Sequence, residues 1–396
     1  MKVTSFTVCN YNYLDRALAL AESYLDTTKE RMKVVIIDEK ADLPDLPADI
    51  LFVQDLEIPS FTKLAFKYDI IELSTAVKPL LAKRFLREAD QVLFFDPDTY
   101  VISDLGPIFE ALEGCDFLLT PHHVDPQPTS PEESDLAMMR FGSFNLGFFA
   151  LNATPESNRF LDWWWERCRD FNFMESQFGL STDQKWVTIA PCFFPGLRVS
   201  RNRGLNIAPW NSFERRLSLV DGVLRVGDVP AVFYHFSNFD PDDLDYRNKR
   251  SSIEDDTVDL VLTDLSAKYL AHYQRFSGLK RPYAFDYDKR GNYISPTFRR
   301  AYACMMDAFS EDVSPFTSDE INRFARRNGL LERKNKPYRL VGFRSLKGAP
   351  VSLRIFTGML FLLLQVVGPN RFFDFCRLMV NRTLLWKNKD MWRAIK

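Results

Sequence analysis

The chain has 396 residues, of which 46% are hydrophobic and 26% are charged. These fractions are ordinary for a globular protein and exclude a disordered, collagen-like or low-complexity chain. No two of the six cysteines lie closer than 24 residues apart, so CxxC zinc and dithiol motifs are excluded. Residues 1–8 have the pattern of a strand and not of a signal peptide, so we expect a cytoplasmic location.

The charge is distributed unevenly along the chain, although the net charge is only −2. Residues 331–396 contain 14 Lys and Arg and 3 acidic residues, whereas residues 1–330 contain 37 basic and 50 acidic residues. A basic tail on an acidic body indicates contact with an anionic surface, either a membrane or nucleic acid. The acidic body would repel a phosphate backbone, so we expect no nucleic-acid partner.

The first 240 residues alternate between strand and helix patterns. Strands are predicted at 3–8, 33–38, 50–53, 91–95, 116–119 and 144–151. Helices are predicted at 16–25, with Asp15 as the N-cap, and at 74–88 and 155–169. The run 33–38 is mainly apolar and ends in Asp38, and the run 91–95 is mainly apolar and is followed by Asp96, which is typical of buried parallel strands. The order predicts an α/β domain with a mainly parallel sheet over 1–240.

The rest of the chain has helical patterns only. Helices at 257–276, 297–309 and 318–327 predict a helical extension over 241–330. The tail, 331–396, contains an apolar run at 355–367 and a segment at 371–386 that mixes aromatic residues with Arg. The apolar run is shorter than the roughly 20 residues that span a bilayer. Two interpretations remain for 350–396, a peripheral helical hairpin on an anionic membrane surface and a hairpin packed on protein.

Paired carboxylates follow the predicted strand 91–95. Asp96, Pro97 and Asp98 leave its carboxyl end, where open α/β sheets bind ligands. Two carboxylates suit a hard divalent cation, Mn²⁺ or Mg²⁺, although an acidic pair can also simply cap a turn.

Two enzyme classes place a DxD motif in this setting. Phosphatases of the haloacid dehalogenase type carry DxD followed by Thr or Val, which Asp96–Thr99 fits. They need the nucleophilic Asp early in the chain and a later GDxxxD motif, which this sequence lacks. Nucleotide-sugar glycosyltransferases of the GT-A type place DxD at the end of a nucleotide-binding half-domain.

Further segments occur in a definite order around the DxD motif. They are Asn12–Tyr24, Thr75–Pro79 (TAVKP), Phe94–Val101 (FFDPDTYV), Phe144–Asn152 (FNLGFFALN), Ser181–Trp186 (STDQKW) and Tyr234–Phe239 (YHFSNF). The ordered set, over residues 1–240, resembles the bacterial relatives of family-8 glycosyltransferases, the glycogenin and galactosyltransferase-like group. The resemblance implies a GT-A fold, which is a Rossmann-like nucleotide-diphospho-sugar transferase domain, a UDP-sugar donor and a divalent metal, usually Mn²⁺.

The resemblance also implies roles for single residues. Asp96, Asp98 and His235 would bind the metal, and Lys78 would lie by the nucleotide or its phosphates. Asn145, Asp183 and Gln184 would line the sugar pocket and act in catalysis. The segment Cys9, Asn10, Tyr11 and Tyr13 follows the first strand, and a nucleotide base could stack on either tyrosine. The lysine that usually follows the metal-binding histidine of the family is missing after His235, and Arg201, Arg203 or Arg247 could replace it.

Each of these residues also has a purely structural interpretation. His235 fits a buried core histidine, Lys78 a solvated helix face, Asn145 a partner of backbone groups, and Asp183 and Gln184 a helix cap.

The predicted function is the transfer of a hexose, with retention, from a UDP-sugar to a hydroxyl of a glycan or lipid-linked acceptor in surface polysaccharide synthesis. Gln184 or Asn145 would steady the sugar, and in an inverting reaction Asp183 would be the base. A DxD phosphatase and a non-catalytic sugar-nucleotide or glycan-binding protein are the alternatives.

Overall fold

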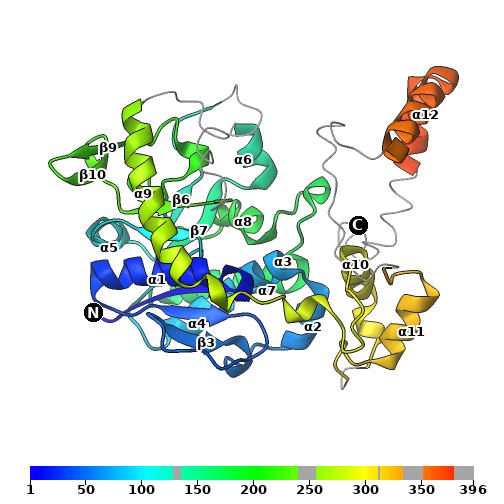
Figure 1. Ribbon diagram of the computed structural model, residues 1–396, viewed down its shortest axis with the longest axis horizontal. Coiled ribbons are helices and arrows are strands. Elements are labelled where there is room, and N and C mark those ends of the chain that lie inside the picture. Colours follow the sequence, from blue (N-terminus) through cyan, green and yellow to red (C-terminus); the bar gives the residue numbers. More distant parts are fainter. Residues whose placement is uncertain (128–134, 240–255, 311–312, 333–350, 379–396) are drawn as a thin grey trace. The chain divides into compact units, whose positions relative to one another are not determined.

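The computed structural model describes residues 1–127, 135–239, 256–310, 313–332 and 351–378 (Figure 1). The chain divides into two compact units. The N-terminal unit consists of Met1–Phe61 and Ile70–Ala284, and the C-terminal unit of Thr62–Asp69 and Phe285–Lys396. The domain boundaries at 240 and 330 stay predictions.

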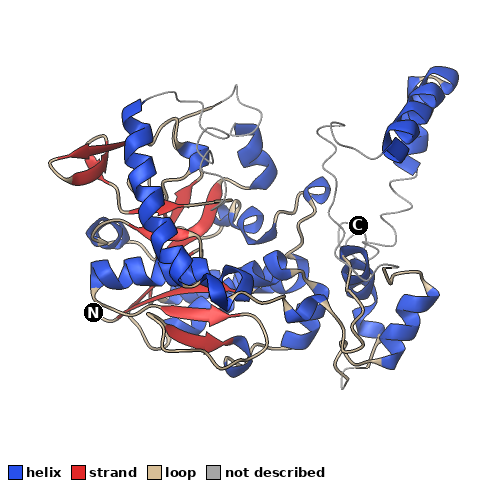
Figure 2. Ribbon diagram, viewed as in Figure 1, coloured by secondary structure: helices blue, strands red, loops and turns tan. Residues whose placement is uncertain are grey.

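A seven-stranded sheet forms the centre of the N-terminal unit, in the order β3-β2-β1-β4-β7-β6-β8 (Figure 2). Its strands are β1 (Val3–Cys9), β2 (Lys33–Ile36), β3 (Asp49–Phe52), β4 (Gln91–Phe95), β6 (Phe117–Pro121), β7 (Phe144–Asn152) and β8 (Leu197–Val199). All neighbours are parallel except β7, which is antiparallel to β4 and β6. The predicted α/β class with a mainly parallel sheet is confirmed.

Two small sheets accompany the large one. Strands β9 (Leu217–Val220), β10 (Val223–Val226) and β11 (Val229–Pro230) form an antiparallel sheet. Strand β5 (Thr99–Val101) pairs with β12 (Phe233–His235), with His235 opposite Thr99. This pairing brings the end of β12 to the turn that follows β4. The sequence analysis missed β5 because the strand is only three residues long.

The helices of the N-terminal unit largely agree with the prediction. They are α1 (Leu14–Thr28), α3 (Ile70–Ala76), α4 (Lys78–Leu86), α5 (Gly106–Leu112), α6 (Asp135–Phe141), α7 (Pro155–Phe171), α8 (Thr182–Val187) and α9 (Asp256–Arg275). Asp15 lies inside the first turn of α1, so its prediction as the N-cap was wrong. The predicted helix 74–88 is interrupted at Val77, and Pro79 lies in the first turn of α4, where its missing N–H is tolerated.

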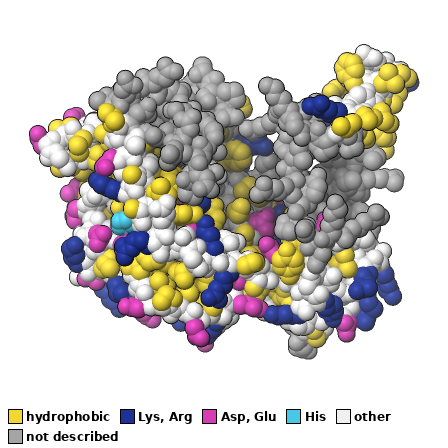
Figure 3. All heavy atoms as spheres, in the orientation of Figure 1, with side chains coloured by type: hydrophobic (Ala, Val, Ile, Leu, Met, Phe, Trp, Pro, Cys, Tyr) yellow, Lys and Arg dark blue, Asp and Glu magenta, His cyan; other side chains and the backbone are white. Residues whose placement is uncertain are grey.

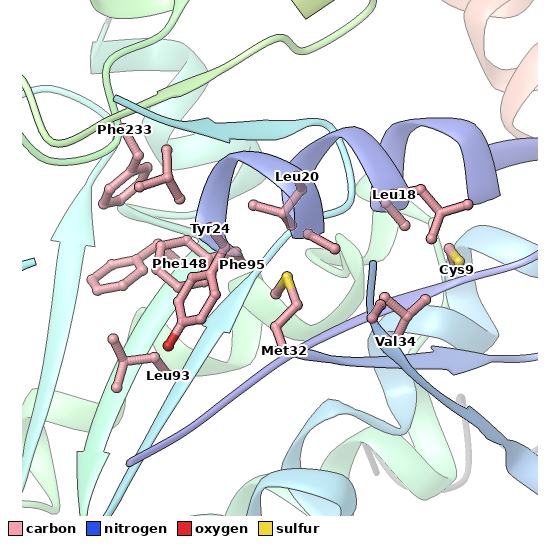
Figure 4. Packing of buried hydrophobic residues seen from close by; sticks show 14 of the residues in the cluster. Cys9, Leu18, Leu20, Tyr24, Met32, Val34, Leu93, Phe95, Phe148 and Phe233 are labelled. Atoms are coloured by element: carbon pink, nitrogen blue, oxygen red, sulfur yellow. The ribbon is translucent and has the colours of Figure 1, made fainter. Parts of the chain in front are cut away.

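Both faces of the large sheet are covered. Successive strand residues point to opposite faces, so Phe94 and Phe95 belong to different cores. The Phe94 ring stacks on Phe149 of β7, with centroids 5.0 Å apart. On the opposite face Leu93 and Phe95 pack with α1 residues such as Leu20, as Figure 4 shows. The sheet is thereby held rigidly, which fixes the positions of the strand ends.

The C-terminal unit contains helices joined by loops over its described residues, which agrees with the predicted helical C-terminal region, although the predicted helix 257–276 belongs, as α9, to the N-terminal unit. Its helices are α2 (Phe61–Lys67), α10 (Pro296–Met305), α11 (Asp319–Arg327) and α12 (Val351–Val367). Phe66 packs edge-on against Phe298, Tyr302 and Phe316, with centroids 4.7–5.3 Å apart. The buried Arg299 guanidinium donates hydrogen bonds to the carbonyls of Ala65 and Tyr68, both at 2.7 Å.

Helix α12 exposes apolar side chains, which Figure 3 shows as a hydrophobic surface. A second helical stretch covers 369–378, the first part of the predicted helix 371–386, whose remainder lies outside the described residues. None of the helices described in the structure has the length and apolar character needed to cross a membrane.

Candidate active site

The turn between β4 and β5 forms the centre of the site. The Asp96 N–H donates to the Gly147 carbonyl at 2.7 Å, which fixes the turn to β7. The Phe236 N–H donates to the Asp98 carbonyl at 2.7 Å, which fixes it to the residue after β12. The Asp96 and Asp98 carboxylates are thus presented at the carboxyl end of a buried strand, as predicted.

Asp96, Asp98 and His235 could hold a metal ion. One ligand atom of each side chain lies within 4.8 Å of the others. His235 Nε2 lies 3.0 Å from Asp98 Oδ1 and 4.0 Å from Asp96 Oδ2. Carboxylate oxygens with one imidazole nitrogen form a donor set that fits Mn²⁺ or Mg²⁺. The side-chain exposure rises from 5% at His235 to 28% at Asp96, so the group opens to solvent on the Asp96 side.

Burial and opposite charge act against each other within this group. Burial lowers the pKa of His235, but the nearby Asp98 and Asp96 carboxylates outweigh it and raise this pKa. Burial raises the pKa of Asp98, but His235 and Arg16 outweigh it, so this pKa lies below its ordinary value. Each side chain therefore favours the charged form of the other, and a metal cation could take the place of the positive charge of the imidazole.

Lys78 is buried beside the same carboxylates. Its Nζ donates hydrogen bonds to Asp96 Oδ1 and the Leu146 carbonyl, both at 3.0 Å, and lies 3.4 Å from Asp183 Oδ2. Burial lowers the pKa of Lys78, but Asp183 and Asp96 outweigh it and raise this pKa. With 4% of its side chain exposed, Lys78 does not belong to a solvated helix face.

Asp183 and Gln184 lie in the first turn of α8 and differ in their surroundings. Burial raises the pKa of Asp183, which Lys78 offsets only in part. Gln184 Nε2 donates to the Phe141 carbonyl at 3.1 Å. The side chain of Asp183 is thus held in the interior, next to Lys78, whereas that of Gln184 is partly exposed.

Asn145 and Gly147 of β7 complete the buried side of the site. Asn145 Oδ1 accepts hydrogen bonds from the Gly147 N–H at 2.9 Å and from Asn206 Nδ2 at 3.0 Å. A Cβ atom on Gly147 would lie 2.4 Å from His235 Cε1. Gly147 therefore leaves space for the imidazole of His235.

The predicted nucleotide segment is largely buried. Cys9 and Asn10 are 3% and 4% exposed, and burial raises the pKa of the Cys9 thiol. Tyr11 is 2% exposed, and its hydroxyl donates to the Glu39 carbonyl at 3.0 Å. Tyr13 is 42% exposed. Of the two tyrosines, Tyr13 offers the ring surface on which a base could stack, and stacking on Tyr11 is not supported.

Two residues beside His235 were missed by the sequence analysis. Asn206 hydrogen-bonds His235 Nδ1, and the Trp210 ring packs edge-on against His235 with centroids 5.0 Å apart. Neither belongs to a quoted motif, so only a structure could find them. Arg203, a suggested substitute for the missing lysine, forms an ion pair with Asp125 at 2.8 Å. Arg247, another arginine suggested in place of the missing lysine, lies outside the described residues.

No protein-family model matches the chain. Two uncharacterized proteins of Bacillus subtilis (strain 168) are similar in sequence. YfnF is 28% identical over 191 residues, which are 47% of this chain and 63% of YfnF, so the match spans less than two thirds of that relative. YfnD is 29% identical over 216 residues, 52% of this chain and 68% of YfnD.

Solved structures of glycosyltransferases are also similar to this chain. The galactosyltransferase LgtC, in complex with donor and acceptor sugar analogs, is 15% identical, with a TM-score of 0.41, over 70% of this chain and 96% of LgtC. Mouse xyloside xylosyltransferase 1 is 14% identical, with a TM-score of 0.37, over 60% of this chain and 98% of the xylosyltransferase. The glycosyltransferase GlyE of Streptococcus pneumoniae TIGR4 is 13% identical, with a TM-score of 0.41, over 73% of this chain and 66% of GlyE.

Proposed function

We propose that this chain is a metal-dependent glycosyltransferase that moves a hexose from a UDP-sugar to the hydroxyl of a glycan or lipid-linked acceptor. The observation that supports this most is the group Asp96, Asp98 and His235 at the carboxyl end of β4. Buried cationic Lys78 lies directly behind Asp96. These residues would hold a divalent cation, which would supply positive charge beside the diphosphate of a nucleotide sugar.

The residues of the site have separable roles in this reaction. Asp96, Asp98 and His235 Nε2 hold the cation, which is Mn²⁺ or Mg²⁺. When bound, the cation supplies positive charge that stabilises the departing diphosphate. Lys78 donates to Asp96 and keeps its carboxylate oriented. Tyr13, with its exposed ring, contributes to the nucleotide site together with backbone groups of Cys9 and Asn10.

The environment of Asp183 favours a retaining reaction. A general base for an inverting reaction must reach the acceptor hydroxyl. Asp183 is 3% exposed and its carboxylate lies against Lys78, so it suits a positioning role. Gln184 is partly exposed and is the residue that we place at the donor sugar.

The test is nucleotide release from a panel of UDP-sugars in the presence of glycan and lipid-linked acceptors. We expect UDP release with Mn²⁺, none with EDTA, and a loss of at least about 100-fold in Asp98→Asn. Asp162→Asn, which removes an exposed carboxylate on α7, should leave release unchanged. Turnover of nitrophenyl phosphate in place of UDP-sugars would indicate the phosphatase, and UDP binding without release the non-catalytic protein.

We also propose that α12 and 369–378 associate peripherally with an anionic membrane surface, on the cytoplasmic side, where a lipid-linked acceptor would be found. Exposed apolar side chains surround α12, including Ile355, Met359, Leu362 and Val366 at 60–76% exposure. The segment 331–396 is strongly basic. Apolar area and positive charge together support binding in the lipid headgroup region.

Co-sedimentation of the full chain with vesicles tests this association. We expect binding to phosphatidylglycerol vesicles at low salt, weaker binding at high salt, and little binding to phosphatidylcholine. Phe361→Ser with Leu362→Ser should weaken it, whereas Leu219→Ser, at an exposed apolar position on β9, should not. Absence of binding to anionic vesicles at low salt would contradict the proposal.

A further inference from the structure

A chain of buried amides connects β7 to His235. The Gly147 N–H donates to Asn145 Oδ1 at 2.9 Å, and Asn206 Nδ2 donates to the same oxygen at 3.0 Å. Asn206 Oδ1 lies 3.2 Å from His235 Nδ1. Asn206 is 1% exposed, so these contacts are shielded from water.

The direction of every hydrogen bond in this series of amides follows from the first one, which the Gly147 N–H donates. A backbone N–H can only donate, so the atom of Asn145 that faces Gly147 must be its oxygen. The same oxygen faces Asn206, which must therefore present its NH₂ group, and this places the Asn206 oxygen toward His235. An amide oxygen only accepts, so Nδ1 of His235 carries the proton.

The consequence concerns the other ring nitrogen of His235. With the proton on Nδ1, a neutral imidazole has its lone pair on Nε2, the atom that faces Asp98 and Asp96. A histidine binds a metal through the nitrogen that lacks a proton, and a hydrogen bond to the other nitrogen fixes the tautomer.

We infer that Asn206 is a positioning residue that fixes the tautomer and ring orientation of His235 for metal binding, and that Asn145 acts through Asn206. This inference rests on the proposed metal site and deepens it. It also revises the role expected for Asn145, because its oxygen already accepts two hydrogen bonds within the protein. The oxygen of Asn145 supports a metal ligand in this arrangement, and the sugar contact expected of Asn145 would fall to its NH₂ group.

Asn206 is itself held firmly, as a positioning residue must be. Its Nδ2 also donates to Thr120 Oγ1 at 3.0 Å. Its carbonyl accepts from Asn211 Nδ2 and Arg215 Nη1, both at 3.1 Å. Arg215 in turn forms a fully buried ion pair with Glu214. Asn206 has a φ of 55°, a left-handed conformation that Asn and Gly adopt most readily.

Substitution at Asn206 tests the inference through metal affinity. Asn206→Gly keeps the backbone conformation and removes the amide, and we expect Mn²⁺ affinity to fall about 10- to 100-fold. Asn206→Asp keeps an acceptor for His235 Nδ1 but cannot donate to Asn145, so we expect an intermediate affinity. Asn152→Ala is the control, because Asn152 is a hydrogen-bonding Asn at the opposite end of β7.

Mn²⁺ affinity is measured by electron paramagnetic resonance of the free ion, and folding by circular dichroism. An Asn206→Gly variant that folds and binds Mn²⁺ as tightly as the unsubstituted chain would overturn the inference. If Asn206→Gly does not fold, Asn206→Asp decides. Weaker Mn²⁺ binding than in the unsubstituted protein supports the inference, and equal or tighter binding overturns it. Equal loss in Asn152→Ala would show a general structural effect and would also overturn it.

A second measurement separates this inference from the proposed function. The chain has four histidines, so ¹⁵N-labelled imidazole signals can be assigned by substitution. In the metal-free protein we expect Nδ1 to carry a proton, whether or not Nε2 shares one with Asp98. An unprotonated Nδ1 would refute the inference even if Mn²⁺ binds. Nδ1 protonation without Mn²⁺ binding would sustain the tautomer assignment and refute the metal-dependent function.

Discussion

Replacement of Lys78 by Met should destabilise the N-terminal unit strongly. Lys78 Nζ lies 3.0 Å from an Asp96 oxygen and 3.4 Å from an Asp183 oxygen. At an effective dielectric constant of about 20, each of these attractions is about 5 kcal/mol before the desolvation of the charges is counted. Desolvation cancels much of this, and removal of one partner from a buried pair typically costs about 3–5 kcal/mol.

Most of this loss should come from Asp183. The Asp96 side chain is 28% exposed, so water can solvate its charge after the substitution, whereas Asp183 is 3% exposed. Asp183→Asn in the Lys78→Met background should therefore restore at least about 1.5 kcal/mol, because it removes the unpaired buried charge.

Urea unfolding followed by tryptophan fluorescence measures these changes in the N-terminal unit, which contains Trp163–Trp165, Trp186 and Trp210. Lys83→Met is the control, because Lys83 is on the same helix and forms an ion pair with the exposed Asp162. We expect a change below about 1 kcal/mol there. Equal effects of the two Lys→Met substitutions, or no recovery with Asp183→Asn, would refute the reasoning.

Three further predictions concern other parts of the chain. Gly147→Ala should displace His235 and lower Mn²⁺ affinity at least about 10-fold by calorimetry, whereas Gly278→Ala, where a Cβ meets open space, should not. Burial raises the pKa of Asp38 from 3.8 to about 6, so the folded state binds a proton that the unfolded chain lacks in this range. The unfolding free energy should fall by up to about 3 kcal/mol between pH 4 and 6, and Asp38→Asn should flatten this dependence. Arg299→Met should unfold the C-terminal unit locally, seen as faster amide exchange, because three or more buried carbonyls lose their donor.

The sequence predicted the large elements because their patterns are long and regular. The continuous apolar run of β4 and the DxD pair after it are local signals, and both could be read without a structure. The order of strands and helices likewise predicted the α/β class. The break at Val77 could not be predicted from the apolar spacing, which continues through it.

The candidate site could be predicted only where a residue type by itself suits a role, as a carboxylate suits a cation. His235 could be placed beside Asp98 only through the resemblance, because the pairing of β5 with β12 spans more than 130 residues. Asn206 depends on three partners from separate parts of the chain, Asn145, Thr120 and His235. No local pattern marks such a residue, because its role arises from tertiary packing alone.

Thermal unfolding with nucleotides tests the central claim most directly. UDP, GDP and CMP are each added with Mn²⁺ or with EDTA, to the unsubstituted chain and to Asp98→Ala. A ligand at about 100 times its dissociation constant stabilises the folded state by about 2.7 kcal/mol, a shift that is easily measured. The account predicts stabilisation by UDP with Mn²⁺, none with EDTA, and none in Asp98→Ala. UDP stabilisation that is equal with EDTA, or that persists in Asp98→Ala, would contradict it.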